Sequence, residues 1–209
     1  MTERDDAFEA RRLERLWASR FGDDYVERNT AFDHRTEFWG CLIQELGPTS
    51  VLEVGCSIGG NLRWMRGAVE RVIGVDVNWK ALTSLRGELP NVGAAVGAAR
   101  KLPFRSSSFD LVFTMGVLIH QPNASLLSVM GEMYRCTRRR LVVGEYFAPD
   151  TIEVPYRGQQ GALFKRDYGS LFLEHFSDLR LVDSGFLGRN DGWDDITYWV
   201  LERTLEPEP

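Results

Sequence analysis

The sequence predicts one α/β domain built on a doubly wound, mostly parallel sheet. Short apolar runs alternate with segments of helical periodicity between about residues 50 and 143, and a glycine-rich segment follows the first run. Alternating strands and helices indicate parallel strands with helices on both faces. Two last strands, near 180–187 and 195–203, are joined by the turn-forming segment 188–192. Such a short connection is typical of an antiparallel hairpin, which we expect at the sheet edge.

The parallel strands are expected where short apolar runs are bounded by turn-forming residues. These runs are 50–54, 71–75, 92–96, 109–115 and 141–143. Helical spacing of apolar residues predicts helices at about 59–67, 78–88, 123–138 and 168–176. Five parallel strands and the C-terminal antiparallel pair together give a seven-stranded, Rossmann-like sheet.

Two amphipathic helices are expected before the first strand. Residues 5–20 carry apolar residues at helical spacing, and a second helical stretch, 31–46, ends at Gly47-Pro48, a stop signal. We expect the N-terminal helices to form a lid. The expected plan is a single domain, 1–205, followed by a disordered tail. Its parts are the N-terminal helices (1–47), a ligand-binding core (48–146), a polar and aromatic loop (147–168), a C-terminal helix and hairpin (169–205) and the tail (206–209).

The composition limits the classes of function. The 209 residues are 44% hydrophobic and 26% charged, and the net charge of −5 argues against nucleic-acid binding. The basic run 138–140 is interpreted as cations at a helix C-terminus. Three widely spaced cysteines without a Cys-x-x-Cys motif argue against a disulfide framework or a metal site. The charged start lacks a signal segment, and no apolar run is long enough to span a membrane, so we expect a cytoplasmic protein.

The richest local signal is the run from Val51 to Asn61, in which a strand leads into glycines. Glycines allow close approach of a ligand, and a following helix N-terminus attracts anions. Alone, the spacing of Gly55, Ser57 and Gly60 also half-matches a dinucleotide fingerprint. Glu53, inside the strand, would repel a pyrophosphate but attract an ammonium group. Asp76 ends the second strand, where a carboxylate can accept both ribose hydroxyls; the alternative is a helix cap.

This combination resembles the class I S-adenosylmethionine-dependent methyltransferases. The resemblance implies that Glu53 lies by the methionyl group, that the Gly55–Gly59 loop packs against it and that Asp76 holds the ribose. The run 101–113 resembles further motifs of that family. The implied cofactor-binding residues lie at the ends of the first four strands and are Glu53, Gly55, Cys56, Ser57, Gly59, Asn61, Asp76, Val77, Ala99, Arg100 and Met115.

Two positions depart from the family pattern. Glycine is common where Ser57 stands, so here a side chain enters the loop. An acidic residue that accepts from the adenine amino group is common at the place of Ala98. The adenine must therefore be held by backbone groups or by a neighbour.

The chain also resembles the narrower group of methylases associated with pseudaminic acid biosynthesis. The matching segments are 21–29, 117–120, 134–136, 144–146, 154–158, 163–168 and 194–197. This resemblance implies a small polar acceptor, a sugar or a nucleotide-sugar.

The acceptor should lie at the carboxyl ends of the strands, near the long loop. Its candidate residues are aromatic, basic or amide side chains of the lid and loop: Tyr25, Arg28, Asn29, Tyr146, Tyr156, Arg157, Lys165, Arg166 and Tyr168. The cations can clamp a carboxylate or phosphate, and the rings can stack on a sugar or base. The alternatives are salt bridges within the loop, core packing for Tyr25 and a helix cap for Asn29.

Methyl transfer chiefly requires alignment of donor and nucleophile, and a general base helps when the nucleophile is a hydroxyl or a protonated amine. We expect that base to be His120, after the fourth strand, with Glu145 as the second candidate. Three other interpretations stay open. They are non-methylating chemistry on the same fold, a dinucleotide-dependent oxidoreductase and a non-catalytic ligand-binding partner.

Overall fold

The computed structural model describes residues 3–28 and 35–204. Before the sheet it places α1 (Glu3–Trp17), α2 (Arg20–Arg28) and α3 (Thr36–Leu46). The expected helix at 5–20 is thus two helices with a break after Trp17. The start of the expected 31–46 helix, the candidate Asn29 and the expected disordered tail lie outside the described residues.

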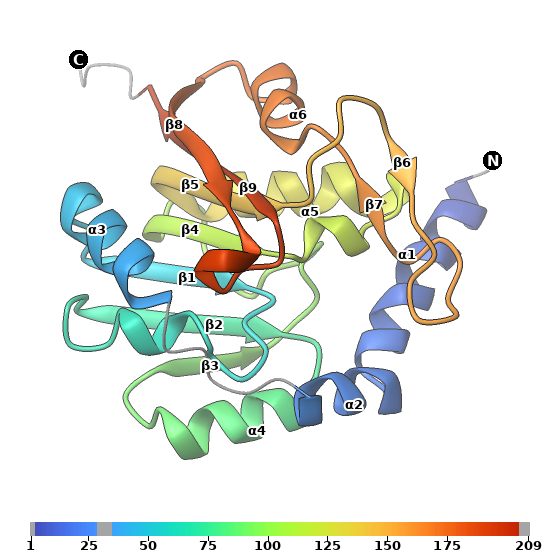
Figure 1. The fold of residues 1–209 in the computed structure, drawn as a ribbon, viewed down its shortest axis with the longest axis horizontal. Helices are drawn as coiled ribbons and strands as arrows, with labels where there is room; N and C mark the ends of the chain where they lie inside the picture. Colours follow the sequence, from blue (N-terminus) through green and yellow to red (C-terminus); the bar gives the residue numbers. More distant parts are fainter. Residues whose placement is uncertain (1–2, 29–34, 205–209) are drawn as a thin grey trace.

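The described residues form the expected seven-stranded sheet, in the order β3-β2-β1-β4-β5-β9-β8. The strands are β1 (Ser50–Val54), β2 (Arg71–Asp76), β3 (Gly93–Val96), β4 (Phe109–Met115), β5 (Thr137–Glu145), β8 (Leu179–Leu187) and β9 (Ile196–Arg203). The first five are parallel, and β9 runs antiparallel to both β5 and β8. The predicted fold class is therefore confirmed, with the hairpin at the sheet edge (Figure 1).

Side chains of the central strands alternate between two hydrophobic cores. On β1, Val51 lies in the core that contains α3 and α4 (Trp79–Glu88), whereas Leu52 lies in the core of α5 (Asn123–Cys136) and α6 (Tyr168–His175). This alternation is the period of two that a strand covered on both faces requires. No helix among the described residues is long and apolar enough to cross a membrane.

Two local predictions were wrong. The expected helix at 59–67 is a single 3-10 turn, η2 (Leu62–Trp64). Gly59 and Gly67 bracket it with left-handed backbone, at φ +79° and +84°, which leaves too few residues for an α-helix. The basic run 138–140 lies in β5 instead of at a helix end, because α5 stops at Cys136.

The expected loop 147–168 is an ordered hairpin. It contains β6 (Ile152–Glu153) and β7 (Phe164–Lys165), which pair antiparallel. The tip of this hairpin is bound to α1, because Arg12 Nη2 donates to the carbonyl oxygens of Gln160 and Gly161, at 3.2 and 3.3 Å. Figure 1 shows α1 and the β6–β7 hairpin side by side. Segments from the two ends of the chain therefore meet there.

Candidate functional site

A large cleft opens at the carboxyl ends of the parallel strands. β1 is flanked by β2 on one side and by β4 on the other, so the chain winds in opposite directions from this point. Such a switch point is where open α/β sheets bind ligands. The cleft has about 910 Å³ of empty space, its open mouth included, and is lined by the ends of β1, β2 and β4 and by α1 and α2.

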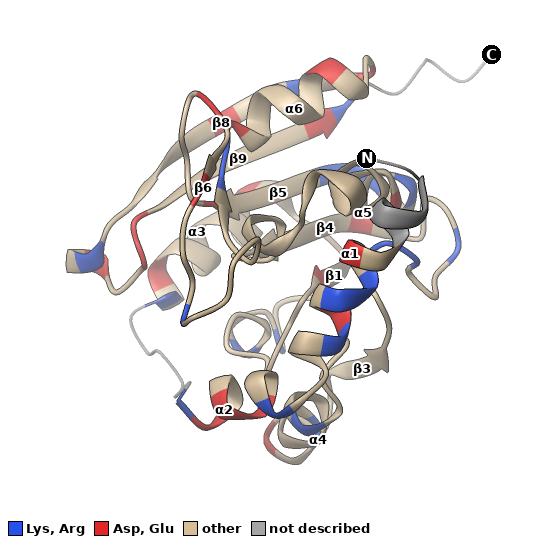
Figure 2. Cartoon of the chain, turned by 90° about the vertical axis from the view of Figure 1, so that its right-hand side faces the viewer, with Lys and Arg blue, Asp and Glu red and all other residues tan. Residues whose placement is uncertain are grey.

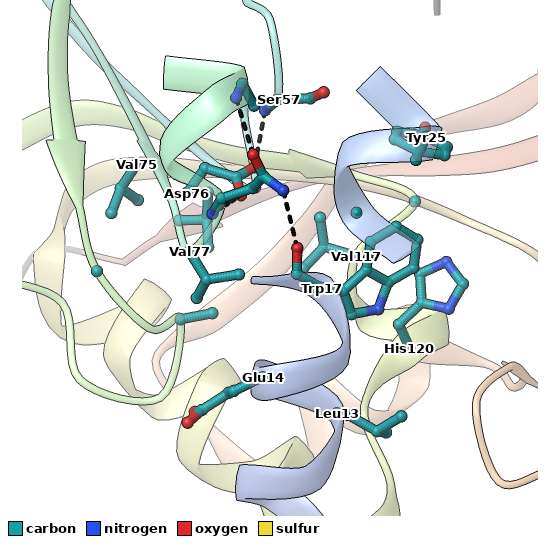
Figure 3. Close-up of a pocket in the computed structure, with 18 of the residues that line it drawn as sticks. Leu13, Glu14, Trp17, Tyr25, Ser57, Val75, Asp76, Val77, Val117 and His120 are labelled. Carbon is teal, nitrogen blue, oxygen red and sulfur yellow. Dashed lines mark hydrogen bonds between the residues drawn. The ribbon is translucent and has the colours of Figure 1, made fainter. Parts of the chain in front are cut away.

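Asp76 organises one wall of the cleft. Its Oδ2 accepts the backbone N–H of Ser57 at 2.8 Å, and its Oδ1 accepts that of Asn78 at 2.8 Å. Figure 3 shows the hydrogen bond between Ser57 and Asp76. The backbone N–H of Val77 also bonds this carboxylate. A carboxylate offers about four acceptor positions, so one remains for a ligand hydroxyl. Burial raises the pKa of Asp76, although the N–H groups of Asn78 and Ser57 act to lower it.

The loop after β1 is shaped for close approach of a ligand. Gly55 has φ +75°, and a side chain there would overlap Cγ2 of Val117. Ser57 also has positive φ, +47°, a region in which glycine is unstrained, and its buried Oγ lacks a hydrogen-bond partner among the described residues. Glycine, which is common at this position in the family that the sequence resembles, would thus fit this backbone without strain.

Gly55→Ala should lower the free energy of unfolding by about 2–4 kcal/mol, because it adds both a steric overlap and a left-handed alanine. Urea unfolding measures this change. Gly131→Ala is the matched control: Gly131 lies in α5 with open space around it, so alanine there should be neutral or slightly stabilising. Equal stability of the two variants would contradict the assigned loop geometry.

Glu53 lies behind the glycine loop and does not line the cleft. It is almost fully buried, its Oε1 accepts from Nδ2 of Asn61 at 2.7 Å, and its Oε2 has no hydrogen-bond partner among the described residues. Burial raises the pKa of Glu53 to about 8, although Asn61 and Arg35 act to lower it. Arg35 Nη1 donates to Oδ1 of Asn61 at 3.3 Å, which brings a cation near this carboxyl group. Sequence reasoning missed Arg35.

The buried carboxyl groups predict a loss of stability at alkaline pH. Burial raises the pKa of Glu53 to about 8 and that of Glu145 to about 7, so both stabilise the fold when protonated and lose this contribution as the pH rises through those values. Burial lowers the pKa of His120 to about 4, so loss of its proton raises the free energy of unfolding as the pH rises from about 4. This increase is nearly complete at pH 6.5. Between pH 6.5 and 8 the free energy of unfolding should therefore fall, by about 2 kcal/mol.

The test compares urea unfolding at the two pH values for wild type, Glu53→Gln and the exposed control Glu174→Gln. The Glu53→Gln variant should show a clearly smaller fall than the other two proteins. Three identical slopes would show that Glu53 is ionised in the folded chain.

The helices α1 and α2 close one side of the cleft. Nδ2 of Asn78 donates to the carbonyl oxygen of Trp17 and to Oδ1 of Asp23, both at 3.0 Å. Arg100 is paired with Glu14 of α1 at 2.5 Å, and Lys80 with Glu27 of α2 at 2.6 Å. These bonds attach the helices to the rim of the cleft, which agrees with the expected lid. Figure 2 shows that positive and negative residues are mixed along both helices.

His120 lines the cleft from the 3-10 turn η3 (Leu118–His120) after β4. Its Nδ1 lies 2.5 Å from the carbonyl oxygen of Ala162, which can only accept, so Nδ1 carries the proton. Nε2 of the neutral ring is then a hydrogen-bond acceptor. Burial lowers the pKa of this histidine to about 4, which keeps it neutral. Figure 3 shows its ring beside that of Trp17.

Glu145 does not have the role that we expected. Its two carboxylate oxygens accept the backbone N–H groups of Val117, Leu118 and Ile119, at 2.8 to 3.1 Å, and the residue is fully buried. A carboxylate occupied in this way supports η3, so we withdraw Glu145 as a candidate base. Its contribution is to hold the turn that carries His120.

Several expected acceptor residues have other contacts. Arg166 is 2% exposed and donates to the carbonyl oxygen of Gln121, to Oδ1 of Asn123 and to the hydroxyl of Tyr168. Tyr168 is fully buried. Arg166 and Tyr168 are therefore structural, and assigning them to the acceptor was wrong. Four further expected residues lie outside the cleft. Arg28 and Arg157 are exposed, whereas Tyr146 and Lys165 are half-buried. The ammonium group of Lys165 lies 5.8 Å from the centroid of the Tyr146 ring.

The expected cofactor residues divide into two groups. Those that line the cleft are Gly55, Ser57, Asp76, Val77, Ala99, Arg100 and Met115. Those that lie behind it are Glu53, Cys56, Gly59 and Asn61. Gly59 packs against Leu85 of α4 and against Leu89 directly after it, and the Cys56 side chain lies next to Gly74 in the core, so these two support the loop. Among the expected acceptor residues, Tyr25 lines the cleft and Tyr156 packs on His120, with ring centroids 5.0 Å apart.

Sequence reasoning missed part of the cleft wall. Trp17, Glu14 and Leu13 of α1 line it, as do Val117 and Gln121 around η3. For the α1 residues the only sequence signal was the amphipathic pattern of that helix, in which an apolar residue that faces a cleft cannot be distinguished from one that faces a core. Val117 lay in the segment 117–120 that resembles the narrower family, but the sequence did not assign it to the cleft.

Comparison with known proteins identifies the fold. Residues 51–140 match the family model described as "Methyltransferase domain". Over 98% of this chain, the structure resembles 1,6-didemethyltoxoflavin-N1-methyltransferase of Burkholderia thailandensis, with a TM-score of 0.73 at 17% identity and 91% of that chain covered. The chain has a Rossmann-like methyltransferase fold.

Other solved structures share the fold at low sequence identity. Magnesium protoporphyrin IX methyltransferase of Synechocystis gives a TM-score of 0.67 at 14% identity, with 92% of this chain and 98% of that chain covered. The [4+2]-cyclase SpnF gives a TM-score of 0.60 at 15% identity, with 82% of each chain covered. Because a cyclase shares it, the fold alone does not decide the reaction.

Two curated relatives match part of the chain. The 2-methyl-6-phytyl-1,4-hydroquinone methyltransferase of Synechocystis is 29% identical over 138 residues, 63% of this chain and 43% of that protein. The tRNA U34 carboxymethyltransferase of Pseudomonas aeruginosa is 42% identical over 84 residues, 37% of this chain and 26% of that protein. The chain thus spans less than half the length of these two relatives.

Proposed function

We propose that the chain is an S-adenosylmethionine-dependent methyltransferase that acts on a small acceptor. The observation that carries this proposal is the cleft wall formed by Gly55, Ser57 and Asp76 at the switch point of a methyltransferase fold. A carboxylate with an unused acceptor position suits a ribose hydroxyl, and the glycine admits a ligand close to the backbone.

The same region disfavours a dinucleotide. Pyrophosphates bind at the N-terminus of an α-helix that follows the glycine loop. Here only the 3-10 turn η2 follows it, and the buried carboxyl group of Glu53 lies behind. Both features favour a ligand whose inner end carries an ammonium group, as the methionyl part of S-adenosylmethionine does.

The residues fit this cofactor in three places. Asp76 would hold the ribose, with Val77, Ala99 and neighbouring backbone along the adenine. Glu53 would lose its proton on binding and then attract the ammonium group from behind the loop, and Arg35 beside Asn61 would attract the carboxylate. When bound, the cofactor supplies a methyl group on a positively charged sulfur. The chain's own part is to align the acceptor, exclude water and take up a proton at Nε2 of His120.

The proposed class of acceptor rests on the sequence. The resemblance to pseudaminic acid-associated methylases implies a sugar or nucleotide-sugar, which stays a prediction. Arg166 was expected to help clamp a phosphate, but it bonds Gln121 and Asn123 instead. A small-molecule acceptor agrees with the net charge of −5, whereas a tRNA acceptor needs a basic surface. A location in the cytoplasm is likewise a prediction from the sequence.

The proposal is tested by incubating the purified chain with S-adenosylmethionine and a panel of acceptors. The panel contains phenols, sugars, nucleotide-sugars and tRNA, and mass spectrometry follows S-adenosylhomocysteine together with a product heavier by one methyl group. Formation of both supports the proposal. If the cofactor binds and an acceptor is converted without a methyl gain, the chain performs other chemistry on this fold, as SpnF does by its name.

A further inference from the structure

Aromatic rings gather around the face of the cleft on which His120 lies. The ring of Trp17 lies 4.6 Å from that of His120, Tyr156 lies 5.0 Å from it, and Tyr25 meets Trp17 edge-on at 5.4 Å. We call these four residues the ring cluster. Trp17, Tyr25 and His120 line the cleft, and Figure 3 shows that they come from the lid helices on one side and from η3 on the other.

Charge is scarce in this part of the cleft. The charged residues among the described ones that line the cleft are Glu14, Asp76 and Arg100. Arg100 is paired with Glu14 at 2.5 Å, and Asp76 lies on the opposite wall with Ser57 and Asn78. A phosphate or carboxylate on the acceptor would therefore meet no unpaired cation among these groups, at a considerable desolvation cost.

The polar groups within the ring cluster suit a hydroxyl. Nε2 of His120 is an acceptor, because its Nδ1 donates to Ala162. An acceptor beside flat aromatic walls matches a ring-bound hydroxyl, which can donate a hydrogen bond to it.

We propose that the acceptor is an uncharged, flat aromatic ring with an acidic hydroxyl, a phenol or an enol of a heteroaromatic ring. It lies against Trp17 and Tyr25, with its hydroxyl at Nε2 of His120. This inference rests on the proposed methyltransferase function and names the substrate class of the same cleft.

The reaction balances with these groups alone. The hydroxyl gives its proton to Nε2 of His120, and an oxygen electron pair forms the new bond to the methyl carbon. The carbon–sulfur bond breaks, and its electron pair stays on sulfur, which becomes a neutral thioether. The methyl ether leaves, and the protonated His120 returns its proton to water.

The weak basicity of His120 agrees with a phenolic substrate. Burial lowers the pKa of His120 to about 4, so it is a weak base. A phenol has a pKa of about 10, as tyrosine does. The pKa of an aliphatic hydroxyl is closer to that of water, which is about 15.7. Proton transfer to His120 is therefore far less unfavourable from a phenol than from a sugar hydroxyl.

The first test compares acceptors with the wild-type chain and saturating S-adenosylmethionine. The probes are catechol and 4-nitrophenol, against methyl glucoside, UDP-glucose and bulk tRNA. We expect S-adenosylhomocysteine and a methyl ether from the phenols at a rate at least about tenfold above that with the sugar probes. Turnover confined to a sugar, a nucleotide-sugar or tRNA would overturn the inference and leave the proposed function intact.

A second test uses variants, with the affinity for S-adenosylmethionine measured by calorimetry in each. Trp17→Leu should raise the KM for the phenol about tenfold, a loss of ring stacking. Phe8→Leu is the matched control, because Phe8 is 65% exposed on the same helix. If Trp17→Leu does not fold, Tyr25→Leu replaces it.

The outcomes separate the two claims. Cofactor binding without conversion of either phenol at millimolar concentration overturns the inference alone. Absence of cofactor binding to the folded wild-type chain overturns the proposed function, and the inference with it.

Discussion

Replacing Asp76 by alanine should weaken the binding of S-adenosylmethionine at least about tenfold, the loss of one charge-assisted hydrogen bond. The effect has two sources in the structure. The ligand loses an acceptor for its ribose hydroxyls, and the N–H groups of Ser57 and Asn78 lose the carboxylate that positions them. Titration calorimetry with the wild-type and variant chains measures the ratio of the dissociation constants.

The two sources can be separated. Asp76→Asn retains one oxygen for a backbone N–H and should lose less affinity than Asp76→Ala. Asp183→Asn is the matched control, because Asp183 is exposed on the edge strand β8 and bonds only the hydroxyl of Tyr198 among the described residues. Unchanged affinity in Asp76→Ala would show that the ribose is held elsewhere.

Replacing His120 by alanine should lower kcat by about 10²–10⁴, the usual contribution of a positioned general base. The dissociation constant of S-adenosylmethionine should change little, because the roles of Asp76 and the glycine loop are retained. His175→Ala is the matched control, since His175 is exposed at the end of α6 and likewise bonds a backbone carbonyl oxygen. Both rates are measured with the acceptor that gives wild-type turnover.

The pH profile gives an independent test of this role. A base must be deprotonated to act, and burial lowers the pKa of His120 to about 4. The wild-type kcat should therefore not fall between pH 7 and pH 5.5 through protonation of this group. A decline centred near 6.5, the ordinary histidine value, would contradict the buried, neutral His120 described above.

The regular part of the fold was predictable because its signals are local. β1 and β4 begin and end at the residues expected from their apolar runs, since strands covered on both faces are mostly apolar. Asp76 was predictable for a similar reason, because a carboxylate that directly follows a buried strand can only lie at the end of the sheet. Val77 could be predicted as a cleft residue for the same reason, because it is next to Asp76 in the chain.

The misassigned roles of Arg166 and Glu145 have a common cause, which is that the deciding contacts are distant in the sequence. The cation of Arg166 was assigned to an acceptor, but its partners Gln121 and Asn123 lie more than forty residues away. Glu145 bonds backbone groups 26 to 28 residues before it. In η2, the spacing of Leu62 and Met65 suits a 3-10 turn as well as an α-helix, so periodicity alone could not distinguish them.

The central claim is that the cleft binds S-adenosylmethionine, and calorimetric titration of the wild-type chain tests it most directly. Parallel titrations with S-adenosylhomocysteine and NAD provide the comparison. We predict one-to-one binding of both adenosyl ligands and none of the dinucleotide. The absence of S-adenosylmethionine binding at millimolar concentration, or tighter binding of NAD, would contradict the account.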